Sequence, residues 1–430
     1  MSQVELFLQP RRPNRLATFV EREGNLLVIP EGLHTIPCTH GIHKFAGKFI
    51  PNLPRYIFRE VLPQDARRVV FDPFCGSGTT LVEAALEGKP FLGLDIDPLS
   101  VLISTAKTQS LSNDEMTTVE EFWRGHDFDI PHFEVVPKVP NLLHWFTERA
   151  TAELSSIKYR CQLLPPRLRL FSLVVFSSII RRVSNADDQT QKTYVSHTLP
   201  KNPPLPSHLF PIFLRRAIDG MREYSSLLGS DPKGSVRQGD AVTDIEALHF
   251  DDVITSPPYI DSIDYVYNQM LEYFWLLEEF GLQSYDDYRA MRKRPMGFRT
   301  HGESMRNGFF RTRLRETERQ FERICSAIGN QSAKEELAVR SFFFDYGQHV
   351  DRVRAKQPRD GVYVSIVGNS LIRGVTVPTV DLIERIHCNA GYELIHRWSY
   401  EIRRHYMKFP RRSNSGKIKQ DYILVFRVSK

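Results

Sequence analysis

Residues 69–95 constrain the fold more than any other part of this sequence. A short apolar run, Val69–Phe71, leads into a turn that contains Gly76 and Gly78. A helical pattern follows, and a second apolar run ends at Asp95. A strand, a tight turn, a helix and a second strand in this order form a βαβ unit, in which the two strands are parallel. The sequence therefore predicts an α/β fold built on a doubly wound parallel sheet.

The glycine turn predicts a cofactor site at one edge of that sheet. Such a turn places backbone N–H groups and a helix N-terminus at the carboxyl ends of the strands. Gly76 and Gly78 have no side chain, so a ligand can lie against the main chain. Asp95 ends the next strand, where a carboxylate can accept both ribose hydroxyls of an adenosine. Since no lysine follows the glycines, a Walker-type phosphate loop is excluded, but dinucleotide enzymes share this layout.

A second turn, Thr255–Tyr259, has the sequence Thr-Ser-Pro-Pro-Tyr and follows another apolar run. The turn is therefore expected at the carboxyl end of a strand, where ligands bind in such sheets. Its prolines make it rigid, so the Ser256 hydroxyl and the Pro257 carbonyl can serve as fixed hydrogen-bond acceptors. Two acceptors that bind both N–H groups of a base amine free the nitrogen lone pair, and the Tyr259 ring can stack on the base. The turn is thus suited to chemistry on an exocyclic amine.

Together, the two turns resemble the cofactor and catalytic motifs of the S-adenosylmethionine-dependent DNA amino-methyltransferases. The resemblance covers roughly residues 40–107 and 235–428. It implies a class I methyltransferase sheet, which is Rossmann-like, with S-adenosyl-L-methionine as the cofactor and a mainly helical recognition insertion. The implied catalytic residues are Ser256, Pro257, Pro258 and Tyr259. Serine at the first position of this motif favours N4 of cytosine, and N6 of adenine is the nearest alternative.

The resemblance also implies a set of cofactor contacts. Residues 45–51 look like the segment that closes over the methionine end of the cofactor, and Asp240 looks like the acid that contacts the adenine amino group. The cofactor-binding residues expected on this basis are Phe45, Lys48, Phe49, Pro51, Asp72, Pro73, Phe74, Gly76, Ser77, Gly78, Thr79, Asp95, Ile96, Asp240 and Ala241.

Six regions are expected along the 430 residues. They are a lead-in (1–38), the cofactor half of the methyltransferase domain (39–109), a mainly helical insertion (110–234), the catalytic half (235–280), an arginine-rich insertion (281–340) and the rest of the sheet (341–430). Neither insertion carries a motif, so both are candidates for target recognition. Within these regions we expect a proline-rich link over 197–211, one aromatic-rich helix over 265–280 and a helix from about 341 to 356.

The arginine-rich insertion is the main candidate for contact with nucleic acid. Residues 289–323 contain eleven Lys/Arg against four acids, an excess of +7, whereas the whole chain carries +6. Arginine pairs bidentately with guanine and with phosphates. A solvated helix face with glutamate partners is the alternative. A second basic stretch spans 403–419, and the expected DNA-binding residues are Arg292, Lys293, Arg294, Arg299, Arg311, Arg313, Arg403 and Arg404.

Other features argue against competing classes of protein. The five cysteines are scattered without a C-x-x-C pair, which favours a reducing cytoplasm over a disulfide framework. Neither a signal peptide nor a membrane-spanning run is visible in the sequence. Pro37-Cys38 precedes the glycine turn, whereas cytosine C5 methyltransferases place their catalytic dipeptide after it. His40 and His43 lack a third ligand at zinc spacing, so no metal site is expected.

The hypothesis is a sequence-specific DNA methyltransferase that modifies N4 of cytosine in duplex DNA, in a restriction-modification or epigenetic system. The implied partners are double-stranded DNA and a cognate restriction endonuclease, in the cytoplasm of a bacterium or archaeon near its nucleoid. The oligomeric state is left open. The alternatives are an N6-adenine DNA methyltransferase, an RNA or tRNA amino-methyltransferase, and a non-catalytic DNA-binding subunit that keeps the fold.

Overall fold

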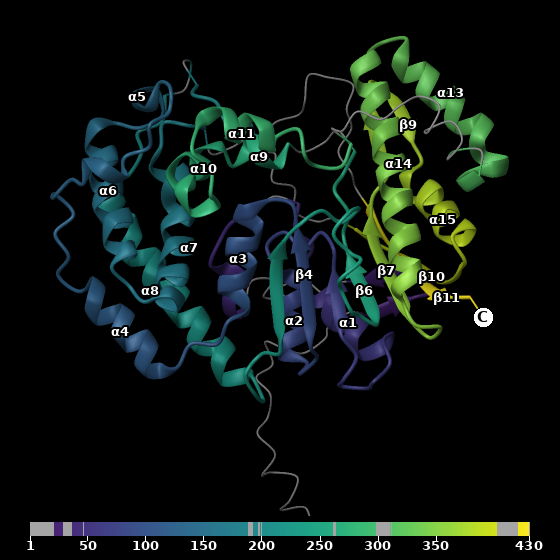
Figure 1. The fold of residues 1–430 in the computed structure, drawn as a ribbon, viewed down its shortest axis with the longest axis horizontal. Helices are drawn as coiled ribbons and strands as arrows, with labels where there is room; N and C mark the ends of the chain where they lie inside the picture. Colours follow the sequence, from purple (N-terminus) through teal and green to yellow (C-terminus); the bar gives the residue numbers. More distant parts are fainter. Residues whose placement is uncertain are drawn as a thin grey trace, which may run out of the picture.

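The fold is built on a nine-stranded sheet with the order β1-β2-β10-β11-β7-β6-β3-β4-β5 (Figure 1). The computed structural model describes residues 21–28, 37–45, 47–187, 192–196, 198, 200–260, 264–297, 310, 312–401 and 420–429. The strands of this sheet are β1 (Glu21–Glu23), β2 (Leu26–Val28), β3 (Val70–Asp72), β4 (Phe91–Asp95), β5 (Gly234–Gln238), β6 (Asp252–Thr255), β7 (Val362–Val367), β10 (Tyr392–Glu401) and β11 (Gln420–Val428). A separate hairpin consists of β8 (Ser370–Ile372) and β9 (Val375–Val377).

The centre of the sheet is parallel and doubly wound. Strands β5, β4, β3, β6 and β7 pair in parallel, and β11 runs antiparallel between β7 and β10. The chain passes from β3 to β4 on one side, whereas β6 pairs with the other side of β3, so the strand order reverses at β3. Ligands in such sheets bind outside the carboxyl ends of the strands at this switch point. The predicted fold class is confirmed.

Helices cover both faces of the sheet, because successive residues of a buried strand point to opposite sides. Val70 and Ile254 belong to one apolar core, with α1, α2, α3, α7 and α8, while Phe71 and Val253 belong to a second core, with α13, α14 and α15. The helices of the cofactor half are η3 (Cys38–Gly41), α1 (Asn52–Glu60), α2 (Thr79–Leu86) and α3 (Pro98–Thr108).

The connection between β4 and β5 is helical beyond α3 and forms the group at the left of Figure 1. The expected link over 197–211 is wrong in its second half, because α8 begins at Pro206 and contains Pro211. A proline at the first helical position has no N–H to lose, so it starts a helix rather than preventing one. These helices are α4 (Asn113–Trp123), η4 (Phe133–Val135), α5 (Leu142–Trp145), α6 (Glu148–Gln162), α7 (Pro166–Val183) and α8 (Pro206–Leu227).

The helices after β6 differ from the expected pattern at two places. The single helix expected over 265–280 is interrupted at Gln269, where the backbone leaves helical geometry. The helix expected from about 341 begins instead at Ala333, because the Ser332 side chain accepts the Glu335 N–H and caps it. The elements are α9 (Tyr265–Asn268), α10 (Met270–Leu276), η5 (Glu278–Phe280), α11 (Tyr285–Met291), η6 (Arg315–Thr317), α13 (Glu318–Gly329), α14 (Ala333–Lys356) and α15 (Thr379–Asn389). None of the helices in the described part of the chain has the length and apolar character needed to cross a membrane.

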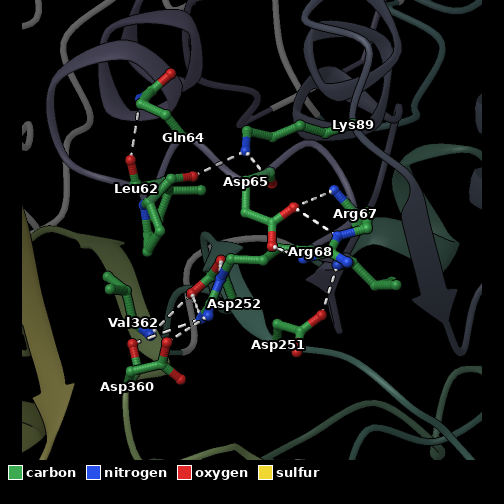
Figure 2. Close-up of polar contacts among 12 residues, drawn as sticks. Leu62, Gln64, Asp65, Arg67, Arg68, Lys89, Asp251, Asp252, Asp360 and Val362 are labelled. Carbon is green, nitrogen blue, oxygen red and sulfur yellow. Dashed lines mark hydrogen bonds and ion pairs between the residues drawn. The ribbon is translucent and has the colours of Figure 1, made fainter.

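An ionic network joins β3, β6 and β7 at their amino ends (Figure 2). The Arg68 guanidinium donates to both carboxylate oxygens of Asp252, each at 2.8 Å, and pairs with Asp360 at 2.7 Å. Asp252 is fully buried and also accepts the Val362 N–H at 3.0 Å. Since a buried carboxylate is tolerated only when it is paired and hydrogen-bonded, this network fixes three strands together at the end opposite the glycine turn.

Candidate active site

A cavity lies at the switch point of the sheet, between the turns that follow β3, β4, β5 and β6. Most of the cofactor-binding residues predicted from the sequence line it. They are Phe45, Lys48, Phe49, Pro73, Phe74, Gly76, Ser77, Thr79, Asp95, Ile96, Asp240 and Ala241. Four separate segments of the chain thus meet at one cavity, and three of them follow parallel strands, which bring their carboxyl ends to a single edge.

The other three predicted cofactor residues are placed around this cavity and do not line it. Pro51 stands at the N-cap of α1, and Gly78 at the N-cap of α2. Asp72 lies beneath the cavity, where its Oδ1 accepts the Thr255 hydroxyl at 2.6 Å and the Phe74 N–H at 3.2 Å. Burial raises the pKa of Asp72 to about 6. This carboxyl therefore links the glycine turn to the first residue of the Thr255–Tyr259 turn.

The glycine turn is held on Asp95. The Gly76 N–H donates to Asp95 Oδ2 at 2.8 Å, and the Asp97 N–H donates to Asp95 Oδ1 at 2.9 Å. Burial, together with the nearby charge of Asp97, raises the pKa of Asp95 to about 7. Gly76 has a φ of +47°, and a Cβ there would lie 3.2 Å from the Phe45 ring. The close approach of Phe45 and the left-handed backbone both explain why glycine is needed at this position.

Ser77 presents a polar atom that no described residue satisfies. Its hydroxyl is buried, has no hydrogen-bond partner among the described residues and belongs to a side chain that lines the cavity. Its carbonyl accepts a hydrogen bond from the ammonium of Lys107, a fully buried residue of α3. An unsatisfied hydroxyl beside the Asp95 carboxyl and a glycine backbone fits a ligand with ribose hydroxyls and an adenine ring. The residues present therefore fit S-adenosylmethionine.

The Thr255–Tyr259 turn borders this cavity and a smaller one. Ser256 and Pro258 line the first cavity, whereas Pro257, Pro258 and Tyr259 line the second. The second cavity is closed on its far side by the end of β7, by the β8 strand and by helices α14 and α15. The turn thus separates two spaces, and Ser256 and Tyr259 face different ones.

Several residues of the cavity wall were not predicted as cofactor contacts. Tyr265 of α9 lines the cavity, and its ring lies parallel to that of Phe45 with centroids 6.0 Å apart. The sequence predicted an aromatic-rich helix here but no contact with a cofactor. Pro295 and Met296 also line the cavity, although they follow the basic run of the arginine-rich insertion. No motif marks them, so only tertiary structure could reveal them. The remaining wall residues are Gly47, Cys75, Asp97, Ser100 and Val266.

The predicted DNA-binding arginines have different environments. Arg292 pairs with Asp264 at 2.7 Å, and its guanidinium lies over the Tyr267 ring. Arg313 pairs with Asp351 and donates to the Asn389 carbonyl. Lys293 and Arg294 are exposed and immediately precede the cavity residues Pro295 and Met296. Arg299, Arg311, Arg403 and Arg404 lie outside the described residues.

His40 of the N-terminal region has a structural role. His40 is fully buried and contacts Glu83 at 2.8 Å, and Arg55 binds the same carboxylate at 2.7 Å. Burial lowers the pKa of His40 to about 4. Within the described residues, no group of three or more His, Cys, Asp or Glu side chains could hold a metal ion.

The comparisons with known proteins agree with the motifs. Residues 39–105 match the N6/N4 methylase family model, described as a DNA methylase. The chain is 24% identical over 411 residues to the type II methyltransferase M.MvaI of Kocuria varians. This match covers 89% of this chain and 87% of that relative. It is 43% identical to the type II methyltransferase M.MjaII of Methanocaldococcus jannaschii over 70 residues, 16% of this chain and 13% of that relative.

Among solved structures, this chain aligns with a TehB-like SAM-dependent methyltransferase from Corynebacterium glutamicum. The alignment covers 88% of this chain and 87% of that protein, with 10% sequence identity and a TM-score of 0.29. The fold assignment therefore rests on the strand order of the chain itself.

Proposed function

Since the chain is related to the N6/N4 DNA methylases, we propose that it is a type II DNA methyltransferase that methylates N4 of cytosine in duplex DNA. The observation that carries this proposal is the position of the Thr255–Tyr259 turn. It stands at the carboxyl end of β6, and Ser256 borders the same cavity as Gly76 and Asp95. A methyl donor in this cavity and an amine at the turn would be neighbours.

The cavity residues have the chemistry to hold the cofactor, which supplies an electrophilic methyl group when it is bound. The Asp95 carboxylate would accept the ribose hydroxyls, and the unsatisfied Ser77 hydroxyl offers a further hydrogen bond. Asp240, at the end of β5, would accept the adenine amino group. The rings of Phe45 and Tyr265 would supply an apolar surface beside the cofactor.

The turn residues would activate the base amine. The Ser256 hydroxyl oxygen and the Pro257 carbonyl would accept hydrogen bonds from its two N–H groups and draw the nitrogen toward tetrahedral geometry. Because the prolines and the Asp72–Thr255 hydrogen bond already fix the turn, these acceptors need little reorganisation as charge develops. The amine loses a proton on methylation, and a water molecule can accept it. The ring of Tyr259 would stack on a base that has left the helix.

The basic run next to the cavity supports a nucleic-acid substrate. Lys293 and Arg294 are exposed and lie directly before Pro295 and Met296, which form part of the cavity wall. Positive charge at the edge of the site would bind the phosphates that flank a displaced base. Both relatives are named as type II methyltransferases, so we place the enzyme in a restriction-modification system with a partner endonuclease.

The test is to identify the methylated nucleoside. The protein is incubated with labelled S-adenosylmethionine and duplex DNA of mixed sequence, and the DNA is hydrolysed to nucleosides. We expect the label on N4-methylcytosine. Label on N6-methyladenine would refute the choice of base, and label on cytosine C5, or on no DNA, would refute the enzyme class.

Ser256→Ala tests whether the turn activates the amine. Loss of one preorganised hydrogen-bonding group in a catalytic site lowers kcat by roughly 100-fold. Binding of S-adenosylmethionine, measured by calorimetry, should stay close to that of the unmodified protein. Full methyl transfer by this variant would show that the turn does not activate the amine.

A further inference from the structure

One buried carboxylate connects the last strand to the catalytic turn. Asp421 stands near the start of β11 and is 4% exposed. It accepts the Tyr259 hydroxyl at 3.1 Å through one oxygen and the Tyr400 hydroxyl at 2.9 Å through the other. Tyr259 and Asp421 are 162 positions apart in the sequence. No motif of the catalytic turn extends to β11.

The topology of the sheet explains how these residues meet. Strands β6 and β7 are parallel, so Tyr259, which follows β6, lies at the edge where β7 ends. Strand β11 is antiparallel to β7, so it begins at that edge, and Tyr422 pairs with Val367 there. On the other side, Tyr400 of β10 pairs directly with Asp421 across the antiparallel ladder. One carboxylate thus lies between a tyrosine of the turn and a tyrosine of the sheet.

The hydroxyls of Tyr259 and Tyr400 stabilise the charged form of Asp421. Burial raises the pKa of Asp421, and the hydrogen bonds from Tyr400 and Tyr259 oppose that shift. In the described part of the chain, no lysine, arginine or histidine forms an ion pair with Asp421. A buried carboxylate is costly without hydrogen-bond donors, so each hydroxyl is held firmly. Burial also raises the pKa of Tyr259 well above its usual value, which keeps its hydroxyl a donor throughout the neutral range.

We propose that Asp421 is a positioning residue that holds the ring of Tyr259 in place before the target base arrives. This proposal rests on the proposed function, in which that ring stacks on the base. A free tyrosine side chain would have to lose rotational freedom when the base binds, and this loss weakens binding. Anchoring the hydroxyl at the far end of the ring reduces that loss, because it holds the side chain in one direction before the base arrives.

Tyr400 provides a matched control, because it donates to the same carboxylate but lines neither cavity. Tyr259→Phe and Tyr400→Phe each delete one hydroxyl and keep the ring. A purely structural role predicts equal effects of the two substitutions. Positioning predicts that Tyr259→Phe lowers kcat for methyl transfer by about tenfold, while Tyr400→Phe stays within about twofold of the unmodified protein. The KM for S-adenosylmethionine should be unchanged in both variants.

The spectroscopic readout is the emission of 2-aminopurine placed at the target position of the duplex. A displaced base that stacks on an aromatic ring is quenched, so Tyr259→Phe should give brighter emission in the complex than Tyr400→Phe does. Thermal unfolding midpoints of both variants show whether they lose similar stability. Equal kcat and equal emission for the two variants would overturn the proposal.

A second variant tests the carboxylate itself. Asp421→Asn keeps the size of the side chain but replaces a charged acceptor by a weaker, neutral one. The kcat of Asp421→Asn should fall, as that of Tyr259→Phe does. The variant that carries both substitutions should have a kcat no lower than the single variants, because each substitution affects the same hydrogen bond. Additive losses would contradict the coupling. Failure of the unmodified protein to methylate any DNA would refute the proposed function. If the unmodified protein is active but Tyr259→Phe and Tyr400→Phe have the same kcat, only the role of Asp421 is refuted.

Discussion

Alanine substitutions of the two glycines that flank α2 can test how closely the cofactor turn packs against α3. Gly78 precedes the helix with φ +74°, and Gly88 follows it with φ +70°. A Cβ on Gly78 would lie 2.8 Å from Ser104 Cβ in α3, whereas a Cβ on Gly88 would have nothing within 4 Å. Alanine at the two positions therefore introduces similar backbone strain but very different contacts.

The expected magnitudes follow from this comparison. A left-handed alanine costs roughly 1–2 kcal/mol, and this is the whole expected loss in unfolding free energy for Gly88→Ala. Gly78→Ala adds an overlap with α3, and overpacking of a close-packed interior costs roughly 1–3 kcal/mol more. The total for Gly78→Ala is then about 2–5 kcal/mol. Relief of the overlap requires α2 and α3 to separate, which would displace Ser77 and Thr79 of the cavity wall.

The assay has two parts. Chemical denaturation compares the stability of both variants, and calorimetry compares their Kd for S-adenosylmethionine. We expect weaker cofactor binding for Gly78→Ala and unchanged binding for Gly88→Ala. If the two variants lose the same stability and bind the cofactor equally well, the contact between the turn and α3 has no part in shaping the site.

Two further predictions concern charged groups. Arg68→Ala leaves the fully buried Asp252 without its cation and should cost about 3–5 kcal/mol of unfolding free energy. Arg67→Ala, which removes a pair at the surface, should leave the unfolding free energy almost unchanged, and chemical denaturation of both variants checks the difference. Cofactor binding should weaken as the pH falls from 8 to 6, because the pKa of Asp95 is raised to about 7 and its protonated form is a poorer acceptor for ribose hydroxyls. Calorimetry across this pH range should show that Asp95→Asn binds more weakly and without the pH step. Since the folded-state pKa of Asp95 lies above its usual value of 3.8, its contribution to stability is complete at low pH and is lost as the pH rises through about 7.

The sequence predicted those parts of the site that depend on local pattern. Gly76 and Asp95 could be assigned because a strand, a glycine turn and a second strand lie within a short stretch of chain. Ser256 could be placed near them because parallel strands share one edge. Met296 and Asp421 could not be predicted, because their contacts depend on how distant segments pack and leave no periodic or motif signal.

The helix errors have a different, local origin. Pro206 was interpreted as part of a link, although proline is well suited to a first helical turn. Ser332 begins α14 by capping it, and a serine in a polar, arginine-rich region gave too weak a signal to move the predicted start. In both cases a local signal, a proline in the first turn or a serine cap, marks where the helix begins.

The Arg68 network (Figure 2) lies before β3 and the glycine turn follows it, so the two occupy opposite ends of this short strand. One group of buried charges that stabilises the fold thus lies away from the residues expected to meet the ligand. Efforts to make the enzyme tolerate heat could therefore be confined to the network side, leaving turnover intact. In a large library of random variants, substitutions near Asp252 should reduce yield, whereas those near Ser256 should leave abundant but inactive protein.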